Sequence, residues 1–125
     1  MSGQLRESAV KKILLVDDDE SIQLLYQEEF IEEGYQVVSA VNGDEALEIF
    51  SKESPDLVIL DIQMPGLNGI EVLRQIKMLK ADTLVILSSA YHEYKQDLGS
   101  WASDDYVVKS SDMTDLKAAV SKLLG

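Results

Sequence analysis

Residues 57–69 read LVILDIQMPGLNG, and this stretch is the strongest single indicator of the fold. An apolar run with β-branched Val58 and Ile59 stands directly before Asp61, and a turn containing Pro65 and Gly66 follows it. A short, continuously apolar run is typical of a strand that is covered on both faces, as in a parallel sheet. The stretch therefore predicts a buried strand that ends at an aspartate and leads into a tight loop.

The same kind of apolar run occurs at four other places, at residues 13–16, 37–41, 84–87 and 106–108. Helical spacing of apolar residues fills the intervals and predicts helices over about 22–30, 46–50, 72–79, 91–102 and 116–124. Five strand–helix units in alternation predict an α/β, flavodoxin-like doubly wound domain. We expect a five-stranded parallel sheet with strand order 2-1-3-4-5 and five helices.

Two of the predicted helices carry more detailed expectations. In the first, the packing stripe is predicted to contain Ile22, Leu25, Tyr26 and Phe30. In the last, Asp112 is predicted to be the N-cap residue, because a short acidic side chain accepts hydrogen bonds from the first free backbone N–H groups.

Composition narrows the class of protein. The chain has 125 residues, 46% of them hydrophobic, which predicts one folded domain over 11–125 behind a leader at 1–10. The absence of cysteine excludes disulfides and thiolate chemistry. A formal net charge of −12 argues against direct nucleic-acid binding, which needs clustered Lys and Arg. With no secretory signal and no apolar run long enough to span a membrane, we expect a cytoplasmic protein without membrane contact.

Polar residues follow four of the five predicted strands. They are Asp17, Asp18 and Asp19 after the first, Asp61 after the third, Ser88 and Ser89 after the fourth, and Lys109 after the fifth. Ligands of doubly wound sheets bind beyond the carboxyl ends of the strands, where these side chains are expected to converge. Crowded carboxylates must bind protons or a cation, and Mg²⁺ suits a few carboxylates with water and a phosphate oxygen.

A carboxylate nucleophile, a divalent ion, a lysine and a hydroxyl together indicate phosphoryl transfer. Each residue also has an ordinary structural interpretation, as a helix cap, a charged loop, a solvated lysine or a loop hydroxyl. Only their convergence at one edge of the sheet favours a site, and spacing alone leaves both interpretations open.

Four motifs in order resemble the receiver domain of two-component response regulators. They are residues 13–20 (ILLVDDDE), 57–69 (LVILDIQMPGLNG), 89–91 (SAY) and 104–109 (DDYVVK). The resemblance covers nearly everything from Lys11 to Gly125, and the Asp-x-x-Met-Pro-x-x-x-Gly block is its most specific part.

This resemblance implies the chemistry of the acidic residues. Asp61 is identified with the phospho-acceptor. Asp18 is identified with a direct Mg²⁺ ligand and Asp17 with a supporting one, while the backbone carbonyl of Gln63 would be a further ligand.

The resemblance also assigns the remaining site residues. Ser89 matches the switch hydroxyl, Lys109 the phosphate-contacting lysine and Tyr106 the aromatic switch position. The family commonly has threonine where Ser89 stands. It usually has a cis-proline after the lysine, where this chain has Ser110. A cis bond before a residue other than proline costs about 2.5–4 kcal/mol, so either Ser110 adopts it under strain or the loop runs differently.

The implied function is that of a phosphorylation-dependent switch rather than an enzyme. The phosphoryl donor is expected to be a sensor histidine kinase or a histidine phosphotransfer protein, because His92 has no helical acceptor motif around it. Phosphorylation is expected to change the face made by helix 91–102, strand 106–108 and the last helix, and so to control an unknown downstream protein. We expect a stand-alone receiver that is a monomer or a weak homodimer.

Three alternatives stay open. A Mg²⁺-dependent aspartate phosphatase needs a second aspartate two residues after its nucleophile, where this chain has Gln63. A flavin binder needs a phosphate-cradling loop after the first strand, where Asp17 and its acidic neighbours would repel phosphate. A pseudo-receiver would bind a partner without taking phosphate. The one feature that favours this alternative is Ser110, which stands where the family usually has proline.

Overall fold

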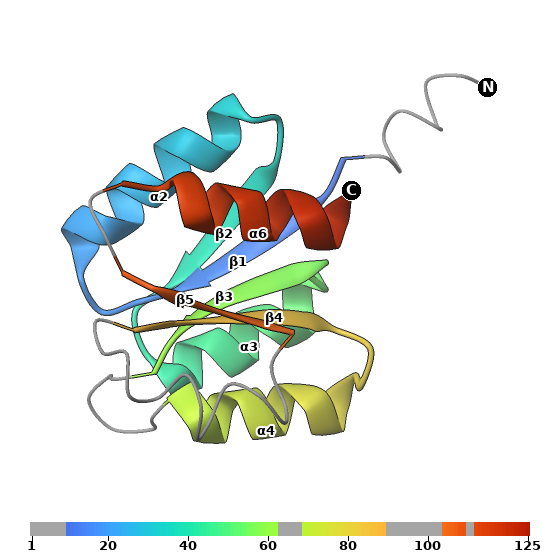
Figure 1. Cartoon of the computed structure of the whole chain (residues 1–125). Coiled ribbons are helices and arrows are strands. Elements are labelled where there is room, and N and C mark those ends of the chain that lie inside the picture. The colour runs from blue at the N-terminus through green and yellow to red at the C-terminus, as the bar shows by residue number, and fades with distance from the viewer. Residues whose placement is uncertain (1–9, 63–68, 90–103, 110–111) are drawn as a thin grey trace.

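The computed structural model describes residues 10–62, 69–89, 104–109 and 112–125. Five strands in these ranges form one sheet (Figure 1): β1 (Lys12–Val16), β2 (Gln36–Ala40), β3 (Leu57–Asp61), β4 (Leu84–Ser89) and β5 (Asp105–Val108). Their order is β2-β1-β3-β4-β5, and each neighbouring pair is parallel. The predicted sheet and strand order are therefore confirmed.

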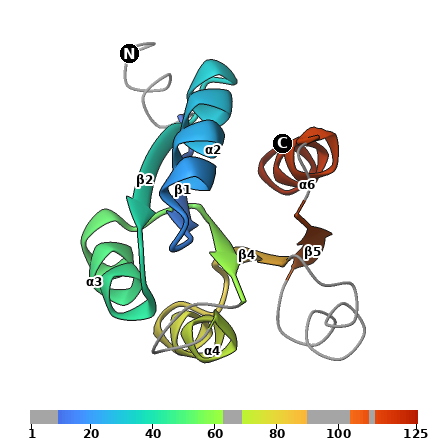
Figure 2. The same cartoon turned by 90° about the vertical axis from the view of Figure 1, so that its left-hand side faces the viewer.

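Helices cover both faces of the sheet. The described part of the chain contains α2 (Glu20–Glu32), α3 (Gly43–Glu53), α4 (Gly69–Leu79) and α6 (Thr114–Leu124). Figures 1 and 2 show α2 and α6 on one face and α3 and α4 on the other. The predicted helix over 91–102 and leader residues 1–9 lie outside the described residues. None of these four helices has the length and apolar character needed to cross a membrane.

Alternation along the strands divides the core into two layers. Leu14, Leu60 and Leu87 pack with α3 and α4, whereas Leu15, Ile59 and Ile86 pack with α2 and α6. Burying each such side chain contributes about 1.5–3 kcal/mol relative to leaving it exposed. Because side chains alternate with a period of two, the residues at 17 and 61 belong to the face covered by α2 and α6.

Helix α2 is capped by an aspartate and buries an unexpected residue. The Oδ1 atom of Asp19 accepts hydrogen bonds from the backbone N–H groups of Ser21 (2.9 Å) and Ile22 (3.3 Å), which caps the helix. The buried face contains Gln23 with Tyr26, whereas Leu25 is 41% exposed. The predicted packing stripe is therefore wrong at Leu25. The helix turns Gln23 inward instead, where its amide has hydrogen-bond acceptors.

The predicted cap of the last helix is displaced by one residue. The cap position of α6 is Met113, not Asp112. The Asp112 carboxylate nevertheless accepts hydrogen bonds from the backbone N–H (2.9 Å) and the hydroxyl (2.5 Å) of Thr114, the first helical residue. Asp112 thus supports the helix start through a local turn of the i to i+2 type, from one position further out.

Candidate functional site

Two aspartates lie side by side at the carboxyl edge of the sheet. Asp17 follows β1 and Asp61 ends β3, and these strands are hydrogen-bonded neighbours with Val16 opposite Leu60. Asp17 is 6% exposed and Asp61 is 5% exposed. Two carboxylates this buried and this close repel each other unless a positive charge lies between them.

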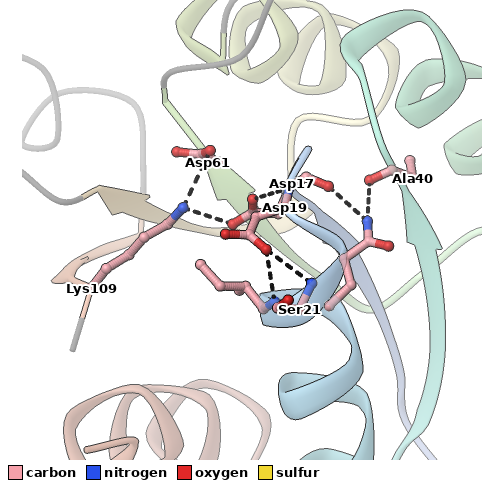
Figure 3. Close-up of polar contacts among 8 residues, drawn as sticks. Asp17, Asp19, Ser21, Ala40, Asp61 and Lys109 are labelled. Carbon is pink, nitrogen blue, oxygen red and sulfur yellow. Dashed lines mark hydrogen bonds and ion pairs between the residues drawn. The ribbon is translucent and has the colours of Figure 1, made fainter. Parts of the chain in front are cut away.

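Lys109 supplies that charge from the end of β5. Its ammonium nitrogen lies 2.7 Å from Oδ2 of Asp17 and 3.3 Å from Oδ2 of Asp61. Figure 3 shows the lysine reaching both carboxylates across the end of the sheet. Burial alone lowers the pKa of the Lys109 amine. The hydrogen bond and charge of Asp17 and the charge of Asp61 outweigh burial, so this pKa lies above its ordinary value.

A third carboxylate completes an acidic cluster. Asp18 is exposed, and its carboxylate, like those of Asp17 and Asp61, contributes one oxygen to a set whose members all lie within 4.8 Å of one another. One exposed and two buried carboxylates leave the cluster open to solvent on one side. Magnesium favours such sites, in which it keeps several waters and binds few protein oxygens. The donor set therefore fits a hard divalent cation.

The backbone of the acidic loop is held by Gln23, a residue that the sequence analysis missed. Its side-chain amide donates to the carbonyl oxygens of Asp17 (2.8 Å) and Ala40 (2.7 Å) and thereby joins α2 to the ends of β1 and β2. The Asp17 carboxylate also accepts a hydrogen bond from the backbone N–H of Asp19 (2.9 Å). One feature of the sequence could have indicated this role: Gln23 stands three positions before Tyr26, and so lies on the same face of the predicted helix.

Gly69 brings the start of α4 against the backbone of Asp61. Its N–H donates to the carbonyl of Ile62 (2.9 Å). A Cβ atom at position 69 would lie 2.1 Å from the carbonyl oxygen of Asp61 and 2.7 Å from Cα of Ile62. Only glycine permits this approach, so Gly69 lets α4 begin directly against the end of β3.

Of the other predicted site residues, the structure places one side chain, that of Tyr106. Ser89 ends β4, and its side chain is not among those described. Tyr106 is buried in the layer covered by α3 and α4, across the sheet from Asp61. Gln63 and Ser110 lie outside the described residues, so their predicted roles stay predictions.

Taken together, the fold and the cluster define a parallel α/β domain with a carboxylate–lysine site at the carboxyl edge of its sheet. The family model for the response regulator receiver domain matches residues 13–121. The chain therefore belongs to the response regulator receiver domain family.

Curated relatives are of two lengths. Sporulation initiation phosphotransferase F of Bacillus subtilis (strain 168) is 40% identical over 116 residues, a match covering 91% of this chain and 94% of that protein. The alkaline phosphatase synthesis transcriptional regulatory protein PhoP of the same organism is 39% identical, but the match covers 48% of its length. The chain thus spans nearly all of the first relative and about half of the second.

Two solved structures are more similar in sequence. The response regulator TrrA from Thermotoga maritima, in complex with Mg²⁺-BeF, shares 51% identity with a TM-score of 0.87, over 91% of this chain and 99% of that one. TrrA in complex with the histidine kinase ThkA shares 50% identity with a TM-score of 0.86, over 93% and 100% of the two chains.

Proposed function

We propose that this chain is a phosphorylation-dependent signalling switch in which Asp61 accepts a phosphoryl group. The observation that carries the proposal is the convergence of Asp17, Asp18, Asp61 and Lys109 at one edge of the sheet. The magnesium-bound TrrA structure supports the same chemistry at a related site. The chain acts as a regulator that is itself modified, and not as an enzyme that turns over an external substrate.

The reaction follows from the residues at the site. An oxygen of the Asp61 carboxylate attacks phosphorus, a new O–P bond forms and the P–N bond of a phosphohistidine breaks. The imidazole nitrogen keeps the electron pair of that bond and takes a proton. Lys109 lies beside Asp61, where its positive charge offsets the negative charge of the phosphoryl oxygens.

The acidic cluster is proposed to hold the cofactor. Asp17, Asp18 and Asp61 would bind Mg²⁺, with the backbone carbonyl of Gln63 as a further ligand by resemblance. When bound, Mg²⁺ would neutralise charge on the transferring phosphoryl group. Gln23 fixes the backbone of the loop that carries two of the carboxylates, so these ligands are positioned before the ion arrives.

The phosphoryl donor is proposed to be a histidine kinase or a histidine phosphotransfer protein. The complex of TrrA with ThkA supports a kinase, and the similarity to sporulation initiation phosphotransferase F supports a phosphorelay. The response is proposed to reach a downstream protein through β5, α6 and the segment 91–102, with Ser89 and Tyr106 as switch residues. A groove between β5 and α6, lined in part by Tyr106 and Ala119, supports a docking role for this face.

Intact mass spectrometry tests the chemistry directly. The protein is incubated with acetyl phosphate and Mg²⁺, in parallel with Asp61→Asn. We expect one phosphoryl adduct on the wild type that requires Mg²⁺ and is absent from the variant. If the folded wild type gains no adduct from acetyl phosphate or from phosphorylated histidine kinases, the pseudo-receiver interpretation replaces the switch. Continuous release of phosphate from an unrelated phosphoester would instead indicate a phosphatase.

A further inference from the structure

A small cavity lies beneath the acidic cluster, between α2 and the sheet. Its polar lining comes from Asp17, Gln23, Tyr26, Asp61 and Ser88. The volume of the cavity that the centre of a water molecule can occupy is about 10 Å³. This is close to the smallest space that a buried water needs, provided that it also has two to four polar partners. The cavity therefore has the size and the chemistry to hold one water molecule.

Ser88 is the residue that points to an occupant. It lies opposite Asp61 in the pairing of β3 with β4, and it is 2% exposed. Its hydroxyl oxygen is buried and has no hydrogen-bond partner among the described residues. Buried hydroxyls are nearly always hydrogen-bonded, and leaving one unpaired is unfavourable. A water in the cavity supplies the missing partner.

Tyr26 adds a second hydroxyl from the opposite wall. The ring is 6% exposed on the buried face of α2. Burial raises the pKa of the Tyr26 hydroxyl, the charge of Lys109 lowers it, and the charges of Asp17 and Asp61 raise it. The hydroxyl is thus within electrostatic reach of Lys109, Asp17 and Asp61. A tyrosine hydroxyl is protonated at neutral pH, so the hydroxyl of Tyr26 can act as a donor.

Of the five polar lining residues, Gln23 already donates to the carbonyls of Asp17 and Ala40, and the other four offer a balanced set of donors and acceptors. Two hydroxyls, from Ser88 and Tyr26, each donate one hydrogen bond, and two carboxylates, from Asp17 and Asp61, each accept one. A water accepts two hydrogen bonds and donates two, so a single molecule can hydrogen-bond to all four groups.

We propose that Ser88 and Tyr26 are positioning residues of the phosphorylation site, which act through one buried water hydrogen-bonded to both hydroxyls and to the carboxylates of Asp17 and Asp61. This inference rests on the proposed function, since it concerns how Asp61 is held for attack. The water fixes the carboxylate from below, on the side away from solvent, while the phosphoryl donor and the cation approach from above. Neither hydroxyl touches the phosphoryl group.

Crystallography at a resolution that orders water tests the binding part. A water within hydrogen-bond distance of the Ser88 and Tyr26 hydroxyls supports the proposal, and a dry cavity overturns it. The direction of the change in Tm on thermal unfolding is an independent test. If water pairs the Ser88 hydroxyl, Ser88→Ala lowers the Tm, whereas removal of an unpaired hydroxyl would raise it. Thr83 is the matched control, because its hydroxyl is also buried without a partner among the described residues and it does not line this cavity.

Phosphoryl uptake tests the positioning part, with Ser88→Ala, Tyr26→Phe, the double variant and Thr83→Val compared with the wild type. We expect each single variant to lower the maximal rate at saturating acetyl phosphate and Mg²⁺ by about 2- to 10-fold. The half-saturating donor concentration stays within about 2-fold, because neither residue contacts the donor. The double variant should be no slower than the slower single variant, since both act through one water. Thr83→Val should match the wild type.

The failures are distinguishable. Wild-type rates in both single variants overturn the positioning role while the proposed function stands, and so do fully additive effects in the double variant. A wild type that takes up no phosphoryl group from any donor overturns the proposed function and the positioning role together. Water binding is then still decided by the crystal structure and by the sign of the Tm change.

Discussion

Lys109 contacts Asp17 more closely than it contacts Asp61, at 2.7 Å against 3.3 Å from its ammonium nitrogen. The lysine is thus anchored mainly by a carboxylate that is not the proposed phospho-acceptor. In the proposed function, phosphorylation changes the charge of Asp61 while Lys109 keeps its main partner. The same geometry places the ammonium in competition with a cation, because Asp17 is also a proposed ligand of Mg²⁺.

This competition predicts how Lys109→Ala behaves. Without the ammonium, two buried carboxylates face each other, so the free energy of unfolding without Mg²⁺ should fall by about 1–3 kcal/mol, between the values typical of exposed and of buried ion pairs. Mg²⁺ should then stabilise the variant more than the wild type, because a cation replaces the lost charge and no longer competes with it. Urea unfolding with and without Mg²⁺ measures both effects.

Lys77 offers a matched control at the other end of the sheet. Its ammonium lies 3.1 Å from Asp104 and donates to the carbonyl of Thr83 (2.6 Å), away from the acidic cluster. Lys77→Ala should lower stability without changing the stabilisation by Mg²⁺. Equal Mg²⁺ effects in the wild type and in Lys109→Ala would contradict the competition between lysine and cation.

Replacing Gly69 with alanine should impair both stability and phosphoryl uptake. In Gly69→Ala the new methyl group would lie 2.1 Å from the Asp61 carbonyl, so the backbone that carries Asp61 must move. Forcing an atom into such a space costs about 1–3 kcal/mol of unfolding free energy. Displacement of Asp61 should also lower the rate of phosphoryl uptake by at least about 10-fold, since small misplacements at a reacting group are costly.

A substitution at Gly34 serves as a control that separates the loss of stability from the loss of phosphoryl uptake. It has a φ angle of +102° and open space around its Cα, so Gly34→Ala is strained but meets no neighbouring atom. We expect Gly34→Ala to lower stability and leave phosphoryl uptake at the wild-type rate. If Gly69→Ala took up phosphate as fast as Gly34→Ala, close packing at Gly69 would not be what places Asp61.

The sequence predicted the parts of the site that topology alone brings together. Asp17, Asp61 and Lys109 each follow a strand, and in a parallel sheet the carboxyl ends of strands share one edge, so their convergence needed only the strand order. The apolar runs located the strands, and the alternation of strands with helices indicated their order; β3 is fully buried, whereas β2 and β5 at the sheet edges are only partly buried. Element ends were less predictable, as the displaced cap at Met113 shows.

The layer beneath the cluster could not be predicted in the same way. Apolar spacing correctly placed Tyr26 on the packing face, but the inward position of Gln23 depends on how α2 is rotated against the sheet, and the same spacing favoured Leu25 instead. Similarly, Ser88 and Ser89 are adjacent in sequence, and the pairing of Ser88 with Asp61 shows which of them belongs to the face beneath the cluster. The rotation of a helix against the sheet and the register of two strands depend on tertiary packing, and the periodic spacing of apolar residues does not determine either.

Replacing Gln23 should lower the affinity for Mg²⁺ although every proposed ligand of the ion is kept. In Gln23→Met the side chain keeps a similar volume but no longer donates to the buried carbonyls of Asp17 and Ala40. Loss of these bonds should cost about 1–3 kcal/mol of unfolding free energy and loosen the loop that carries Asp17 and Asp18. Mg²⁺ affinity, measured by titration calorimetry, should fall by about 10- to 100-fold, the range typical for residues that orient ligands. Gln27→Met, one turn further along α2, should leave this affinity unchanged, and an equal loss in both variants would refute the bracing role.

The stabilisation that Asp112 gives to the start of α6 should depend on pH. The hydrogen bonds from Thr114 hold the pKa of the Asp112 carboxyl below its ordinary value of 3.8. A carboxyl with a lowered pKa in the folded state stabilises the protein above the unfolded-state value, and this contribution is lost as the pH falls through the folded-state value. Asp112→Ala should therefore have a lower Tm than the wild type at pH 7, and the difference should shrink as the pH falls below about 4. Calorimetry of both proteins from pH 7 to pH 3 measures the difference, and a gap that stays constant over this range would show that the carboxylate charge at Asp112 does not stabilise the helix start.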